Sequence, residues 1–125
     1  MENIHDSVVQ DIVSYLNTVM YDVYINPGQE KNAGIGDNYP DVILTKKNET
    51  TVRFIMEVET ADSVSTDEAI GQWKKYTKEI SATFYLVVPD SSLRKAKDLC
   101  QREGINARFV TYSVDKKDVI TYNFQ

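Results

Sequence analysis

The sequence lacks three features that would place it in special classes of protein. Its single cysteine, Cys100, cannot form an internal disulfide, and we expect it to fill the core. No apolar run approaches the roughly 18 residues that a membrane span needs, so no membrane association is expected. The opening segment MENIHDSVVQ does not have the basic-then-apolar layout of a signal peptide, and we therefore expect a cytoplasmic protein.

The chain also contains no internal repeat, low-complexity tract or interdomain linker. Its 125 residues suit a single domain, 1–125, that buries roughly two thirds of its unfolded surface. A hydrophobic content of 42% and a charged content of 26% are ordinary for a globular protein.

Acidic residues outnumber basic ones, and they are unevenly placed. The net charge is −5, with −9 in residues 1–70 and +4 in residues 71–125. The split fits an acidic site beside a basic surface, although scatter over solvated faces explains it equally well. Overall acidity does not favour strong nonspecific binding of nucleic acid, which depends on phosphate neutralisation by Lys and Arg.

Hydrophobic periodicity predicts alternating helices and strands along the whole chain. Helices are expected over 4–20, 66–78 and 91–103, and strands over 21–25, 41–45, 51–59, 83–88, 107–114 and 119–124. The strand at 83–88 is apolar throughout, which is typical of a central strand buried on both faces. This order predicts an α/β fold with a mixed sheet flanked by helices.

Three carboxylates occur where a buried strand would normally avoid charge, in the segment YPDVILTKKNETTVRFIMEVET at residues 39–60. Alternate side chains of a strand share one face, so Glu57 and Glu59 are expected on the same face, about 7 Å apart at their Cα atoms. If the two strands of this segment pair as a hairpin, Asp41 lies near the end that carries both glutamates. The three acids can then converge.

Two readings of these acids stay open from the spacing alone. Converging carboxylates repel one another, and a hard divalent cation such as Mg²⁺ removes that conflict because it prefers oxygen ligands. Alternatively, Glu57 and Glu59 lie at an exposed rim of the sheet and are simply solvated.

The same segment resembles the PD-(D/E)XK nuclease superfamily. YPD before the first strand and EVE at the end of the second stand where that family has its P-D … E-x-K core. The resemblance assigns Asp41 and Glu57 to the two acids of the family. It assigns Val58 to the residue whose backbone carbonyl often also binds metal. Glu59 stands where most members have lysine.

A second motif follows in the expected helix, where QWKKY provides Gln72 and Tyr76. They match the Q-x-x-x-Y motif of the RecB-like, Holliday-junction-resolvase-like branch, and their spacing puts both on one helix face. A hydrogen-bonded core pair is the alternative reading. The resemblance covers about residues 4–88 and implies a restriction-endonuclease-like αβββαβ core, which a C-terminal αββ segment would extend.

The function that the resemblance implies is hydrolysis of DNA phosphodiester bonds by an endo- or exodeoxyribonuclease that depends on Mg²⁺ or Mn²⁺. Glu59 cannot supply the positive charge of the usual lysine, but it could act as a general base or bind a second metal. A lysine from the helix is another candidate. Lys75 lies about 60° from the direction of Gln72, while an exposed surface lysine is the simpler reading.

His5 shares a stripe with Val9 and Ile12 on the first expected helix. The resemblance implies a metal ligand or a positioning group at His5, with Asp6 as a neighbouring option, while a solvated or structural role is the plainer reading. DNA is the expected partner, and a homodimer or partner protein would supply specificity. The second functional hypothesis is a non-catalytic nuclease-fold binding or regulatory module, which Glu59 and a pI of about 4.8 favour.

Overall fold

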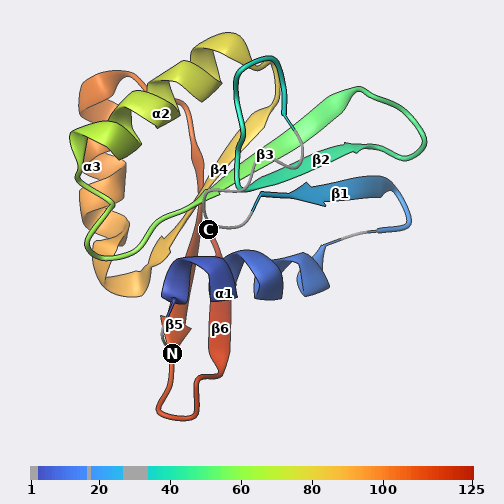
Figure 1. Cartoon of the computed structure of the whole chain (residues 1–125). Helices are drawn as coiled ribbons and strands as arrows, with labels where there is room; N and C mark the ends of the chain where they lie inside the picture. Colours follow the sequence, from blue (N-terminus) through green and yellow to red (C-terminus); the bar gives the residue numbers. More distant parts are fainter. Residues whose placement is uncertain (1–2, 17, 27–33) are drawn as a thin grey trace.

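The strands form one mixed sheet whose strand order, β1-β2-β3-β4-β5-β6, follows the chain (Figure 1). The computed structural model describes residues 3–16, 18–26 and 34–125. The strands are β1 (Tyr21–Ile25), β2 (Val42–Lys46), β3 (Val52–Val58), β4 (Thr83–Pro89), β5 (Arg108–Val114) and β6 (Ile120–Phe124). Neighbouring strands are parallel from β3 to β5 and antiparallel elsewhere. The predicted α/β class with a mixed sheet is confirmed.

Helices cover both faces of the sheet (Figure 1). α2 (Asp67–Glu79) joins β3 to β4, and α3 (Leu93–Glu103) joins β4 to β5 after a 3-10 turn, Asp90–Ser92. Each of these helices connects two parallel strands, and the two connections run in the same direction across the sheet. Because such connections are right-handed, both helices lie on the same face of the sheet. Their buried residues share a core cluster with Ile55 and Leu86, whereas α1 (Ile4–Ile12) packs on the opposite face with Met56 and Val87.

The first helix is shorter than the sequence predicts. α1 ends at Ile12, and a 3-10 turn, Val13–Tyr15, follows it. Leu16 is then extended, with φ −90° and ψ 153°. Val19, within the helix predicted over 4–20, is 84% exposed. A helix is stabilised mainly by packing of its apolar face. Beyond Ile12 this packing is weaker, because Val13 and Leu16 are only partly buried against the core.

The second helix begins where the sequence predicts. Thr66 is its N-cap, and the Thr66 hydroxyl accepts a hydrogen bond of 3.2 Å from the backbone N–H of Ala69. Trp73 and Tyr76 are buried with Ala69, while Thr77, predicted on the inner face, is half-buried. The buried face of α2 therefore includes Tyr76, one of the predicted site residues.

The predictions for the second half of the chain also hold. Phe84, Leu86 and Val88 of β4 point into the core beneath α2 and α3, and Val87 points to the α1 side. β4 is thus buried on both faces, as its apolar run predicts. α3 ends at Gly104, whose φ of 68° is the left-handed conformation that favours glycine at a helix C-terminus.

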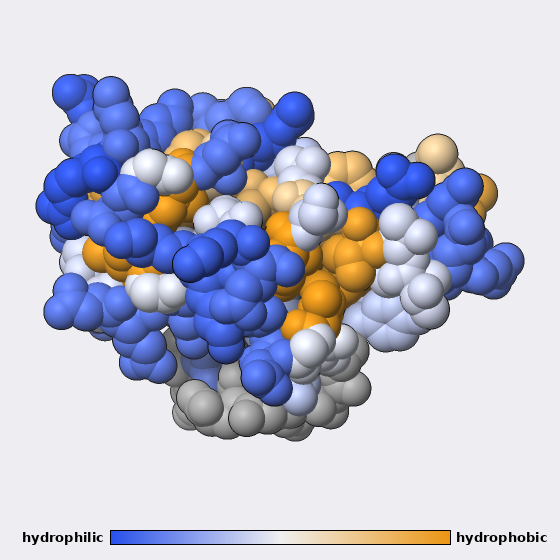
Figure 2. All heavy atoms as spheres, turned by 90° about the horizontal axis from the view of Figure 1, so that it is seen from above, coloured by the Kyte–Doolittle hydropathy of each residue, from blue (hydrophilic) through white to orange (hydrophobic). Residues whose placement is uncertain are grey.

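The molecular surface over the helices is largely hydrophilic, and hydrophobic residues come to the surface in the middle of the view from above (Figure 2). None of the helices in the described part of the chain has the length and apolar content that a membrane span requires.

Truncation of Leu86 tests the central position of β4. Leu86 is fully buried, and Leu86→Ala is expected to lower the free energy of unfolding by about 2–5 kcal/mol, because it removes buried methyl groups and leaves a cavity. Lys95→Ala, at an exposed position of α3, should change it by less than about 0.5 kcal/mol. Chemical denaturation followed by circular dichroism measures both, and equal effects of the two changes would argue against the central placement.

Candidate functional site

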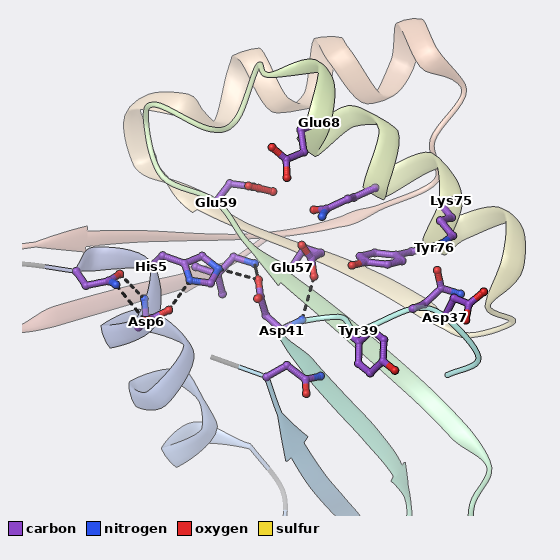
Figure 3. Close-up of a pocket in the computed structure, with 15 residues that line it drawn as sticks. His5, Asp6, Asp37, Tyr39, Asp41, Glu57, Glu59, Glu68, Lys75 and Tyr76 are labelled. Carbon is purple, nitrogen blue, oxygen red and sulfur yellow. Dashed lines mark hydrogen bonds and ion pairs between the residues drawn. The ribbon is translucent and has the colours of Figure 1, made fainter. Parts of the chain in front are cut away.

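A polar cavity of about 530 Å³ lies where the carboxyl end of β3 meets the beginning of α1 and one side of α2 (Figure 3). Every site residue predicted from the sequence lines it: His5, Asp41, Glu57, Val58, Glu59, Gln72, Lys75 and Tyr76. They come from α1, from the end of β3 and the residue after it, from α2, and, for Asp41, from the segment that leads into β2. The fold therefore brings the predicted residues together around one space.

Asp41 and Glu57 are tied to each other by the pairing of β2 with β3. Val42 lies opposite Met56 in the antiparallel ladder, which places Asp41 opposite Glu57. The backbone N–H of Asp41 donates to Glu57 Oε1 at 2.9 Å, and the N–H of Val58 donates to Asp41 Oδ2 at 2.8 Å. The two side chains are only 6% and 5% exposed, so they are not solvated rim charges.

The burial of these acids has an electrostatic cost. Burial raises the pKa of Glu57 well above its usual range, and the negative charges of Asp41 and Glu59 raise it further. One hydrogen bond from a backbone N–H acts in the opposite direction. Among the described residues, Asp41 Oδ1 and Glu57 Oε2 have no hydrogen-bond donor. The pair thus has negative charge that the described part of the protein only partly neutralises.

His5 contacts carboxylates through both ring nitrogens. Its Nε2 lies 3.1 Å from Asp41 Oδ2, and its Nδ1 lies 2.8 Å from Asp6 Oδ1. The hydrogen bond to Asp41 is the main reason why the pKa of His5 is raised to about 9. Both ring nitrogens already face carboxylate oxygens, so this geometry fits a group that positions Asp41.

Glu59 has a different environment from the other two acids. Ser63 Oγ donates to Glu59 Oε1 at 2.9 Å, and Trp73 Nε1 donates to Glu59 Oε2 at 3.0 Å. Burial raises the pKa of Glu59 to about 7, and these two hydrogen bonds limit the rise. Both carboxylate oxygens therefore already have donors from the protein.

The face of α2 that borders the cavity carries Gln72, Lys75 and Tyr76. Figure 3 shows His5 on one side of Asp41, with Lys75 and Tyr76 on the other. Burial raises the pKa of the Tyr76 hydroxyl above its usual range, and the nearby charge of Glu57 adds to this effect. Lys74 is directed elsewhere, because its Nζ lies 2.9 Å from Glu103 Oε1 on α3. Lys75, not Lys74, is thus the lysine of this helix at the cavity.

Acidic, amide and hydroxyl side chains dominate the lining of the cavity. Within the described residues, no group of three or more His, Cys, Asp or Glu side chains is arranged to hold a metal ion. Both carboxylate oxygens of Glu59 have donors, while Asp41 and Glu57 each keep one oxygen without a donor among the described residues. Mg²⁺ commonly uses one or two carboxylates and completes its shell with water and substrate phosphate.

Sequence reasoning missed the partners of Glu59, namely Ser63 and Trp73. A signal was present for Trp73, because a buried indole N–H usually requires an acceptor and Glu59 was expected near the same face. Asn38 was also missed. Its Oδ1 is buried without a hydrogen bond in the described residues, and its amide N–H groups donate to Ile35 O and Glu79 Oε1. Asn38 lines the cavity, so its Oδ1 is a third unpaired oxygen in this region.

Comparison with known proteins adds no relative to this picture. No model of a protein family, no curated protein and no solved structure matches this chain.

The raised pKa of Glu57 predicts how stability depends on pH when no divalent cation is present. The folded protein retains the Glu57 proton at pH values where the unfolded chain has released it, so this group favours folding at acidic pH. Its contribution declines as the pH rises above about 4.5, the ordinary pKa of glutamate. Each unit of pKa difference corresponds to about 1.4 kcal/mol.

Glu57→Gln, which has no such proton, should therefore be more stable than wild type at pH 8 and lose this advantage at pH 4. Urea denaturation in EDTA measures the difference. Glu103→Gln is the matched control, because Lys74 and Arg102 lower the pKa of Glu103 and its substitution should bring no gain at pH 8. A Glu57→Gln protein less stable than wild type at pH 8 contradicts the assignment.

Proposed function

We propose that this protein is a metal-dependent nuclease that hydrolyses DNA phosphodiester bonds. The element order α1-β1-β2-β3-α2-β4 supports a restriction-endonuclease-like core, which α3, β5 and β6 extend. The observation that carries the proposal is the buried pair Asp41 and Glu57, each with an unpaired oxygen beside a cavity that Lys75 also lines.

Asp41 and Glu57 would hold Mg²⁺ or Mn²⁺ through their unpaired oxygens, and the resemblance assigns the backbone carbonyl of Val58 to the same metal. The metal would polarise the scissile phosphate and lower the pKa of a bound water. The hydrogen bonds between Asp41, Glu57 and Val58 fix both carboxylates before any ligand arrives. Such preorganisation reduces the reorganisation needed during the reaction.

The face of α2 would bind the substrate next to these acids. Lys75 supplies positive charge where phosphate charge develops, a role that lysine has in most members of the resembling family. Gln72 can donate and accept through its amide, and the Tyr76 hydroxyl stays protonated because its pKa is raised. Together they offer donors to phosphate oxygens, while His5 holds Asp41 from the other side.

The second candidate is a non-catalytic nuclease-fold module that binds DNA or a partner protein. The specific observation in its favour is Glu59, which occupies the usual lysine position and has both oxygens bonded to Ser63 and Trp73. A module of this kind would bind a divalent cation without cleaving DNA. A homodimer or a partner protein would supply sequence preference in either case.

Isosteric neutralisation of the acid pair tests the metal site. Asp41→Asn and Glu57→Gln should each weaken Mn²⁺ binding more than about tenfold, or about 1.4 kcal/mol, because each removes a charged ligand. Both should also abolish cleavage of labelled single- and double-stranded DNA. Asp98→Asn, at an exposed position on α3, is the control and should bind Mn²⁺ as wild type does.

Isothermal titration calorimetry and gel assays provide the two measurements. Mn²⁺ affinity unchanged by both substitutions would falsify the site, and Mn²⁺ binding without cleavage of any DNA would favour the non-catalytic module.

The two adjacent lysines of α2 give a matched pair. Lys75→Ala should reduce kcat/KM for DNA by about 10²-fold or more, as the loss of one charge-stabilising group does elsewhere. Lys74→Ala should have little effect, since Lys74 pairs with Glu103 away from the cavity. Steady-state cleavage rates at fixed ionic strength compare them, and an equal loss from both would show that general surface charge, not position, matters.

A further inference from the structure

We infer that Glu59 is a positioning residue, which fastens α2 to the end of β3 so that Gln72, Lys75 and Tyr76 stand over the Asp41–Glu57 pair. The inference rests on the proposed function, because the residues that Glu59 would position belong to that site. It replaces both roles that the resemblance leaves open for Glu59, a general base and a ligand of a second metal.

Glu59 is bonded to four separate parts of the fold. Its carboxylate accepts from Ser63 Oγ in the loop before α2, at 2.9 Å, and from Trp73 Nε1 in α2, at 3.0 Å. Its backbone N–H donates to Val87 O in β4 at 2.8 Å. The Tyr112 hydroxyl of β5 donates to its carbonyl at 2.7 Å. The residue thus joins β4, β5, the loop and α2 at one point.

These bonds leave the Glu59 carboxylate little freedom to do chemistry. A hydrogen bond to a carboxylate is shorter and stronger than one between neutral groups. Trp73 is fully buried, and its indole N–H has no capacity other than as a donor. A proton or a metal at Glu59 Oε2 would therefore have to share that oxygen with the buried indole N–H of Trp73.

The bond to Trp73 also fixes the rotation of α2 about its axis. Successive residues of a helix are separated by about 100°, so the direction of Trp73 determines the directions of Gln72, Lys75 and Tyr76. Trp73 points from α2 towards Glu59 at the end of β3, two residues beyond Glu57. Loss of this bond would let the helix turn or shift over the acid pair while its apolar contacts persist.

The Glu59→Gln variant distinguishes a positioning role of Glu59 from a role as general base or metal ligand. The amide of Glu59→Gln can still accept from Trp73 and can donate to Ser63, but it is neither a base nor a charged ligand. Under the positioning role, Glu59→Ala lowers DNA cleavage and Glu59→Gln restores it to within about fivefold of wild type. Loss of a general base instead costs about 10²–10⁴-fold, with glutamine as with alanine.

A comparison of single and double variants tests whether Glu59 affects cleavage by placing Lys75. Because Glu59 would place Lys75 together with Gln72 and Tyr76, the double variant Glu59→Ala/Lys75→Ala should lose less activity than the product of the two single losses. Multiplied effects in the double variant would mean that Glu59 acts independently, and the inference would be wrong.

A fluorescence measurement tests the inference even if the protein cleaves no DNA. Trp73 is the single tryptophan, so its emission and its quenching by acrylamide report directly on the Glu59 contact. Glu59→Ala should shift the emission and increase quenching, and Glu59→Gln should leave both near wild type. Should Glu59→Ala not fold, Ser63→Ala, which removes the other donor to this carboxylate, takes its place and should increase quenching to a smaller extent.

Two results would overturn the inference. One is a folded Glu59→Ala with the emission and quenching of wild type. The other is a Glu59→Gln with unchanged Trp73 quenching but with Mn²⁺ binding or cleavage reduced about 10²-fold, which would make Glu59 a ligand or a base. A protein that neither binds Mn²⁺ nor cleaves DNA contradicts the proposed function alone, since the Trp73 readout does not depend on it.

Discussion

The antiparallel pairing of β2 with β3 is the constraint on which the site depends. It sets Asp41 opposite Glu57 and allows each to take a hydrogen bond from the backbone of the facing segment. A shift of register by one residue would turn every side chain of a strand to the other face. Asp41 and Glu57 would then no longer meet, and the cavity would lose its acidic floor.

The consequence of that pairing is stored electrostatic repulsion. Burial and the nearby charges of Asp41 and Glu59 raise the pKa of Glu57, so ionisation of Glu57 disfavours folding. His5 from α1 contacts Asp41 and offsets part of this negative charge. It lies on the opposite side of Asp41 from α2. The unpaired oxygens of Asp41 and Glu57 are the observation on which the proposed metal site rests.

Glu59 lies at the same end of β3, but its carboxylate is hydrogen-bonded to other parts of the protein. α2 carries the polar groups that border the acids, yet its buried face is mainly apolar and would tolerate small rotations. The hydrogen bonds of Glu59 to Ser63 and Trp73 give this packing a defined orientation. Three neighbouring acids thus divide into a pair with unpaired oxygens and one whose oxygens are both bonded within the protein.

The sequence predicts much of this arrangement because local rules govern it. Strand alternation puts Glu57 and Glu59 on one face, hairpin pairing brings Asp41 to them, and helical spacing distinguishes Lys75 from Lys74. Partners that depend on how helices dock escape prediction, as the bond between Trp73 and Glu59 shows. The early end of α1 escapes it as well, because the apolar periodicity continues beyond Ile12 although Val13 and Leu16 are only partly buried. Residues 27–33 of the predicted loop lie outside the described part of the chain.

The central proposal is that Asp41 and Glu57 jointly hold a divalent cation. The most direct measurement is an anomalous-difference map from crystals grown or soaked with MnCl₂. A shared metal site predicts one peak within coordination distance of a carboxylate oxygen from Asp41 and one from Glu57. Glu59 should remain bonded to Trp73. A peak bound by other residues, or an empty site at saturating Mn²⁺, would contradict it.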